Sequence, residues 1–173
     1  LSGEMEKIGV EVKTDFTVID LKKKSNKIIG INTSEGFFPI NNVVVAAGNS
    51  SAKLIKNLGV SIPIKPVKGY SATLNVRNIK NVPKLAIVDD AMHAAVIPLG
   101  QRLRLAGTAE FAGFNTEINS DRIDGLFTVL EGLYPNISAE VDKNNVETWT
   151  GLRPMSSDGK PFIGPGNIEG LYL

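Results

Sequence analysis

The sequence contains no cysteine and a single histidine, His93, among its 173 residues. The absence of cysteine excludes disulfides, thiolate nucleophiles and cysteine-ligated metals, and it leaves the redox compartment undecided. One histidine also excludes a metal site built from several histidines. No apolar run is long enough to span a bilayer. The formal net charge of +1 argues against nucleic acid as a partner, because phosphate binding needs a concentrated basic face.

The remaining composition is typical of a globular domain, with 42% hydrophobic and 21% charged residues. The sequence has no Walker loop and no Gly-x-Gly-x-x-Gly turn. Asp89 and Asp90 are neighbours, and in a strand they would point to opposite faces, so shared acid–base work is not expected. The residues therefore predict no catalytic side chain and no metal site.

The first part of the chain is rich in short β-branched segments. Val10–Val12, Phe16–Leu21 and Lys27–Thr33 have the composition of strands, and small polar residues between them favour turns. We therefore predict an antiparallel meander over residues 9–40.

The apolar run Val43–Gly48 is continuous rather than alternating. Such a run predicts a strand buried on both faces, as in the parallel sheet of an α/β unit. Ser50 or Ser51 would cap a short helix after it. We interpret the chain before Pro63 as part of a nucleotide-binding α/β unit.

The second part of the chain has the pattern of an antiparallel sheet with one long helix. Alternation in Arg102–Ala106 places Leu103 and Leu105 inward and the arginines outward. Ser120 begins a helix with apolar residues at helical spacing, and Pro135 lies past its end. A sheet with such a helix indicates an α+β fold. We predict strands at Gly69–Val76, Ala94–Ile97, Arg102–Ala106 and Val146–Leu152.

The two ends of the sequence are unusual for a natural domain. The chain opens on Leu1 without a methionine, and Leu171–Leu173 resembles the middle of a strand. Domains seldom end inside an apolar strand, because its edge would be left bare. We therefore expect the chain to be a fragment.

Arg153 is the residue whose position most clearly suggests a role in binding. It follows the strand segment Trp149–Leu152, and Pro154 restricts the backbone directly after it. An arginine held at a strand end can bind a carboxylate through two parallel N–H bonds. A structural salt bridge with a neighbouring acid is the more common role of such a charge, and from the residues alone both interpretations stay open.

Four stretches of the sequence carry a family resemblance. They are Val43–Gly48, Pro66–Ser71, Gly107–Phe111 with Gly113–Asn115, and Trp149–Pro161. In this order, along nearly the whole chain, they resemble the D-amino acid dehydrogenase small subunit, within the wider family of FAD-dependent D-amino acid oxidases and glycine oxidases. The Trp-Thr-Gly-Leu-Arg-Pro segment is the most specific stretch, and the run of small apolar residues is the least specific.

The resemblance implies a flavin-dependent oxidative deamination of D-amino acids to 2-oxo acids and ammonia, by hydride transfer from the α-carbon to FAD. It implies that Arg153 binds the substrate carboxylate and that Tyr70 and His93 line the substrate cavity. For His93, a role as a partly exposed strand residue stays open beside this one.

The resemblance also implies that Val18, Ala46, Ala47 and Gly48 bind the FAD cofactor, the small residues allowing close approach. Val18 could equally be a strand residue that faces the core. We predict a partial FAD-binding domain at residues 1–62, a substrate-binding domain at 63–150 and a return segment at 151–173. Because the glycine-rich turn for the FAD pyrophosphate is missing, we expect these 173 residues alone to bind FAD weakly or not at all.

Two other functions remain open. One is a glycine- or sarcosine-type oxidase that passes electrons to oxygen, and the other is a non-catalytic amino-acid-binding module. The resemblance implies a D-amino acid as the small-molecule partner and a cytoplasmic location, with peripheral association with the inner membrane through the electron acceptor. It implies no oligomeric state.

Overall fold

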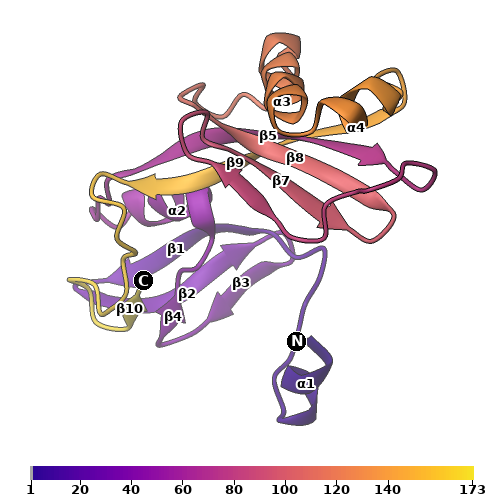
Figure 1. The fold of residues 1–173 in the computed structure, drawn as a ribbon. Coiled ribbons are helices and arrows are strands. Elements are labelled where there is room, and N and C mark those ends of the chain that lie inside the picture. The colour runs from indigo at the N-terminus through magenta and orange to yellow at the C-terminus, as the bar shows by residue number, and fades with distance from the viewer. Residues whose placement is uncertain (1) are drawn as a thin grey trace. The chain divides into compact units, whose positions relative to one another are not determined.

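The computed structural model describes residues 2–173, which divide into two compact units. One unit comprises the chain up to Ile64 together with Ser156–Leu173, and the other comprises Lys65–Met155. Each unit has its own hydrophobic core. Antiparallel sheets with few helices confirm the predicted α+β class (Figure 1).

The first unit contains the predicted meander. The short helix α1 (Ser2–Lys7) precedes three antiparallel strands, β1 (Val18–Lys24), β2 (Lys27–Thr33) and β3 (Gly36–Pro39), in the order β1-β2-β3. The strand predicted at 10–12 is wrong. Both valines of that segment are exposed and neither has a sheet partner, so β-branched composition alone does not produce a strand there.

The apolar run after the meander forms β4 (Val43–Val44), which pairs in parallel with β10 (Leu171–Tyr172). The 3₁₀ helix η1 (Gly48–Ser50) and the predicted short helix, α2 (Ser51–Lys56), follow it. Burial on both faces was predicted and is wrong here, because Val44 is 70% exposed. This sheet has only two strands, and nothing among residues 2–173 covers that side of β4.

The second unit is a five-stranded sheet with two helices. Its strands lie in the order β6-β7-β8-β5-β9, and the pairs β6–β7, β7–β8 and β8–β5 are antiparallel. The bounds are β5 (Ile64–Asn75), β6 (Ile87–Asp89), β7 (Ala94–Leu99), β8 (Arg102–Glu110), α3 (Ser120–Leu133), α4 (Pro135–Glu140) and β9 (Val146–Ser156). The sequence did not predict β6 or α4.

The helix α3 begins at Ser120, as predicted, and ends before a proline. The Asn119 side chain accepts a hydrogen bond from the Asp121 backbone N–H at 3.0 Å, which satisfies one of the free donors of the first turn. Pro135, expected past the end of this helix, is the first residue of α4, where its missing N–H costs nothing.

The two faces of this sheet differ in what covers them. On the helix-covered face, alternate residues of β5, β7 and β8 pack against α3 and α4 (Figure 1). Leu103 and Leu105 are buried there, as predicted, whereas Arg102 and Arg104 lie on the opposite face. We call this opposite face the pocket face. The helix-covered core consists mainly of Tyr70, Ala72, Leu74, Val96, Leu103, Leu105, Leu126, Phe127 and Leu130.

Candidate functional site

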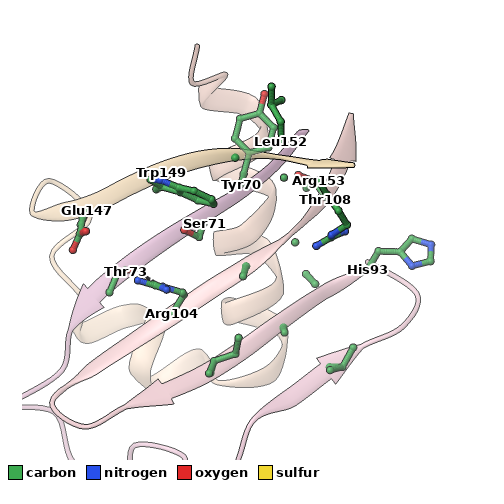
Figure 2. Close-up of a pocket in the computed structure, with 18 residues that line it drawn as sticks. Tyr70, Ser71, Thr73, His93, Arg104, Thr108, Glu147, Trp149, Leu152 and Arg153 are labelled. Carbon is green, nitrogen blue, oxygen red and sulfur yellow. Dashed lines mark hydrogen bonds between the residues drawn. The ribbon is translucent and has the colours of Figure 1, made fainter. Parts of the chain in front are cut away.

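The pocket face carries a concave pocket of about 900 Å³, at the upper end of the size usual for small-molecule sites. It is formed within the second unit by β5, β6, β7, β8 and β9 (Figure 2). Its lining combines small or apolar side chains with a few polar ones. The polar or aromatic members are Tyr70, Ser71, Thr73, His93, Arg104, Thr108, Glu147, Trp149 and Arg153.

Alternate residues of β9, namely Glu147, Trp149, Gly151 and Arg153, contribute to this lining, and Leu152 joins them near the end of the strand. Val146 and Thr148, at the alternate positions near the start of the strand, line a separate hollow beside α3. The period of two characteristic of a strand therefore presents the aromatic and cationic side chains of β9 to one cavity.

Arg153 is exposed on the pocket lining, and Figure 2 shows its guanidinium group on the side of the pocket near Thr108. Within residues 2–173, no carboxylate lies within 4.0 Å of this guanidinium group. The salt-bridge interpretation therefore has no partner in the described chain. A guanidinium group on a cavity wall without an acidic partner is suited to binding an anionic ligand.

The same side of the pocket contains strained backbone. Thr108 has φ 63° and His93 has φ 48°, both in the left-handed region. The Thr108 N–H donates to the His93 carbonyl at 3.2 Å, and the β5–β8 register shifts at this point. The Thr108 hydroxyl oxygen is buried without a hydrogen-bond partner in the part of the chain that the structure describes. Strain and bulges of this kind are concentrated at functional sites.

The glycine beside this bulge permits close strand packing. A side-chain carbon at Gly107 would lie 2.7 Å from both the Ala94 Cβ and the His93 carbonyl oxygen. Real contacts of this type are not so short, so β7 and β8 could not approach each other as they do with any larger residue at this position.

His93 and Tyr70, both predicted to contact substrate, are placed differently. His93 belongs to the lining, but Figure 2 shows its imidazole directed away from the sheet. Tyr70 borders the pocket, but its side chain belongs to the helix-covered core and is 2% exposed. Substrate contact by either residue remains a prediction.

A buried polar cluster, which sequence reasoning missed, surrounds Tyr70. The Tyr70 hydroxyl donates to the Glu110 carboxylate, and the Lys68 ammonium lies 3.9 Å from the same carboxylate. Lys68 also donates to the Asn115 side-chain carbonyl at 3.3 Å and to the Glu117 backbone carbonyl. One signal was available in the sequence: a lysine two residues before the apolar Tyr70–Leu74 face requires a buried partner.

A second arginine lines the pocket away from Arg153. Arg104 is half-buried, and its Nε donates to the Thr73 hydroxyl at 3.0 Å. Glu147 is a carboxylate of the lining, and it pairs with Arg102 at 3.3 Å. Sequence reasoning placed Arg104 on this face but did not predict its presence in a cavity.

The residues predicted to bind FAD lie in the first unit. Val18 is the first residue of β1, half-buried and paired with Thr33. Ala46, Ala47 and Gly48 are exposed at the end of β4, and Gly48 has φ 54°. Because their side chains have at most one carbon, a flat ligand could approach this backbone closely. The segment therefore fits a flavin nucleotide, although the Ala47 N–H is already donated to the Ser51 hydroxyl at 3.1 Å.

Comparison with known proteins identifies the family. Residues 1–173 match the DAO family, described as FAD dependent oxidoreductase. The chain belongs to this family of FAD-dependent oxidoreductases. The predicted family is thereby confirmed, and with it the expectation of a flavin enzyme at the level of the family.

Three proteins illustrate what this DAO-family chain resembles. The D-amino acid dehydrogenase of Vibrio atlanticus is 37% identical over 172 residues, which are 99% of this chain and 40% of that protein. An uncharacterized oxidoreductase of Halorhodospira halophila is 36% identical over 95% of this chain and 75% of its own length. The crystal structure of glycine oxidase from Bacillus cereus has a TM-score of 0.79 and 29% identity, covering 95% of this chain and 44% of that one.

The chain spans 40% of the length of the Vibrio atlanticus dehydrogenase. None of the helices in residues 2–173 is long and apolar enough to cross a membrane.

Proposed function

We propose that the enzyme containing this chain oxidises D-amino acids to 2-oxo acids and ammonia with FAD, and that this chain provides the substrate pocket. The observation that carries the proposal is the Arg153 guanidinium group, exposed in a 900 Å³ pocket without a carboxylate partner among residues 2–173. Membership of a family of FAD-dependent oxidoreductases supports the chemistry.

Arg153 would bind the α-carboxylate through two parallel N–H bonds, which fix both the position and the orientation of the amino acid. The lining of the pocket also contains Ala95, Ala106 and Gly107, whose small size leaves room for the α-carbon and its substituents. The chain thus contributes by positioning the substrate, and none of its side chains is required to act as an acid or a base.

Val18, Ala46, Ala47 and Gly48 would hold the cofactor in the first unit. Bound FAD would supply the acceptor for two electrons and the α-hydrogen, leaving an imine that water hydrolyses to the 2-oxo acid and ammonia.

Relatives named D-amino acid dehydrogenase support D-amino acids as the substrate class. A glycine-type oxidase is the second candidate, supported by the 29% identical glycine oxidase of Bacillus cereus. The higher identity to the relative named D-amino acid dehydrogenase, 37% against 29%, supports the first candidate. Oxygen consumption with glycine that exceeds turnover of D-alanine would support the second.

Turnover of paired D- and L-amino acids by the flavin-loaded enzyme tests the proposal. We expect D-alanine to be oxidised and L-alanine not, and kcat/KM for D-alanine to fall about 10- to 100-fold in Arg153→Lys, since a charge-assisted bidentate contact is lost. Arg77→Lys is the matched control, because Arg77 is exposed and contacts Gln101 outside the pocket. Unchanged kinetics in Arg153→Lys would remove Arg153 from the site. Carboxylate binding without turnover would favour a binding module.

A further inference from the structure

The indole of Trp149 lies in the pocket in an unusual position. Trp149 is 61% exposed although it is the largest side chain of β9. Its ring extends along the strand over Gly151, on the side toward Arg153 (Figure 2). A side-chain carbon at Gly151 would lie 2.0 Å from the indole Cη2 and 2.7 Å from Cζ2. The indole therefore packs directly over Gly151, and any larger residue at position 151 would displace the indole.

Trp149 and Arg153 lie on the same face of β9, four residues apart. At the rise of an extended strand their Cα atoms are about 13 Å apart, and both side chains line one cavity. An amino acid held at its carboxylate by Arg153 would therefore extend its side chain toward the exposed indole. The strands beside β9 contribute Ser71, Ala106 and Ala95 to the same lining, and these residues offer no charge and little bulk.

We propose that Trp149, whose indole packs over Gly151, is the specificity-determining wall of the substrate pocket. It selects D-amino acids with large apolar or aromatic side chains. The proposal rests on the proposed function for the identity of the reacting group. An indole offers a wide, rigid surface, and burial of a substrate ring against it removes apolar area of both partners from water.

The charged groups of the pocket suggest a competing possibility, a preference for substrates with a charged side chain. Arg104 would favour a substrate whose side chain ends in a carboxylate, and it has no carboxylate within 4.0 Å among the residues described. Its Nε is already engaged with the Thr73 hydroxyl, and Glu147 adds a negative charge to the lining. An anionic side chain that reached Arg104 would also meet the negative charge of Glu147, whereas an apolar one needs no charged partner and can pack against the indole.

Trp149 provides its own probe, because it is the single tryptophan of the 173 residues. We expect 3-phenylpropanoate to change its fluorescence and to bind about tenfold more tightly than propanoate, which has the same carboxylate and no ring. In Gly151→Ala this advantage should fall below about threefold, since the indole is displaced but not removed. Gly132→Ala is the matched control, because a methyl group there meets nothing within 4 Å.

A second measurement covers the possibility that Gly151→Ala fails to fold. Trp149→Ala removes a mostly exposed side chain, so folding is retained, and in the flavin-loaded enzyme the kcat/KM ratio of D-phenylalanine to D-alanine should fall about tenfold, with Trp149→Phe restoring part of it. Equal binding of the two acids, or glutarate bound more tightly than 3-phenylpropanoate in an Arg104-dependent manner, would overturn the inference. If no amino acid is oxidised, the proposed function fails, while the fluorescence titration still decides the role of Trp149.

Discussion

The helix-covered face and the pocket face of the five-stranded sheet are built from alternate residues of the same strands. The helix-covered face is almost entirely apolar, and the charge it buries, on Lys68, is paired and hydrogen-bonded. The pocket face carries two guanidinium groups without carboxylate partners among residues 2–173, an exposed indole and a hydroxyl without a partner.

Within this one sheet, the helix-covered face therefore contributes mainly to stability, and the pocket face is suited to ligand binding. Buried apolar contacts contribute to the free energy of unfolding, and satisfied polar groups are the rule in such cores. Unpaired cations and strained backbone at Thr108 and His93 contribute little to stability, and they are features expected where a ligand binds. The comparison predicts opposite consequences for substitutions at neighbouring positions of one strand.

The largest expected effect comes from adjacent residues of β8. Leu105→Ala should lower the free energy of unfolding by about 3–4 kcal/mol, because a fully buried side chain is replaced by a cavity. Arg104→Ala, one residue away on the pocket face, should lower it by less than about 1 kcal/mol. Urea unfolding of both variants measures the difference. Equal losses of unfolding free energy in the two variants would show that the pocket face contributes as much to stability as the helix-covered face.

Removal of the buried ammonium group should have the next largest effect. Lys68→Met leaves the Glu110 carboxylate and the Tyr70 hydroxyl without their cation, and we expect a loss of about 2–3 kcal/mol of unfolding free energy. Lys65→Met is the matched control, since Lys65 is exposed on the same strand. Thermal unfolding compares them, and a Lys68→Met variant as stable as its control would mean that the cluster is not stabilising.

Relief of backbone strain should give a small effect of opposite sign. Thr108→Gly removes a left-handed threonine and a buried unpaired hydroxyl group, so we expect a gain of about 1 kcal/mol in stability. Thr148→Gly, at a β9 residue without positive φ, should instead lose about 1 kcal/mol. A loss of stability in both variants, seen by chemical denaturation, would show that Thr108 is not strained.

Much of this fold could be predicted because local patterns determine it. Alternation placed Leu103 and Leu105 in the core, and helical spacing from Ser120 onward located α3. The strand β6 and the helix α4 could not be predicted, because their few residues lack a clear period and are held by neighbours distant in sequence.

The site was predictable only in part. The motif around Arg153 placed an arginine on a strand, but only the fold shows that no described carboxylate meets it. The Lys68–Glu110 pair joins residues 42 positions apart, so no local sequence pattern predicts it. The contact of Trp149 with Gly151 is local, but it depends on the side-chain rotamer, which the sequence does not specify.

The most direct measurement follows kcat/KM for D-alanine and unfolding free energy together, in the flavin-loaded enzyme carrying Arg153→Met or Leu105→Ala. We predict that Arg153→Met lowers kcat/KM at least tenfold and changes stability by less than about 0.5 kcal/mol. We predict that Leu105→Ala loses about 3–4 kcal/mol of stability while its folded fraction keeps kcat/KM within about threefold. Arg153→Met with full activity, or a loss of activity that only follows unfolding, would contradict the assignment of substrate binding to the pocket face.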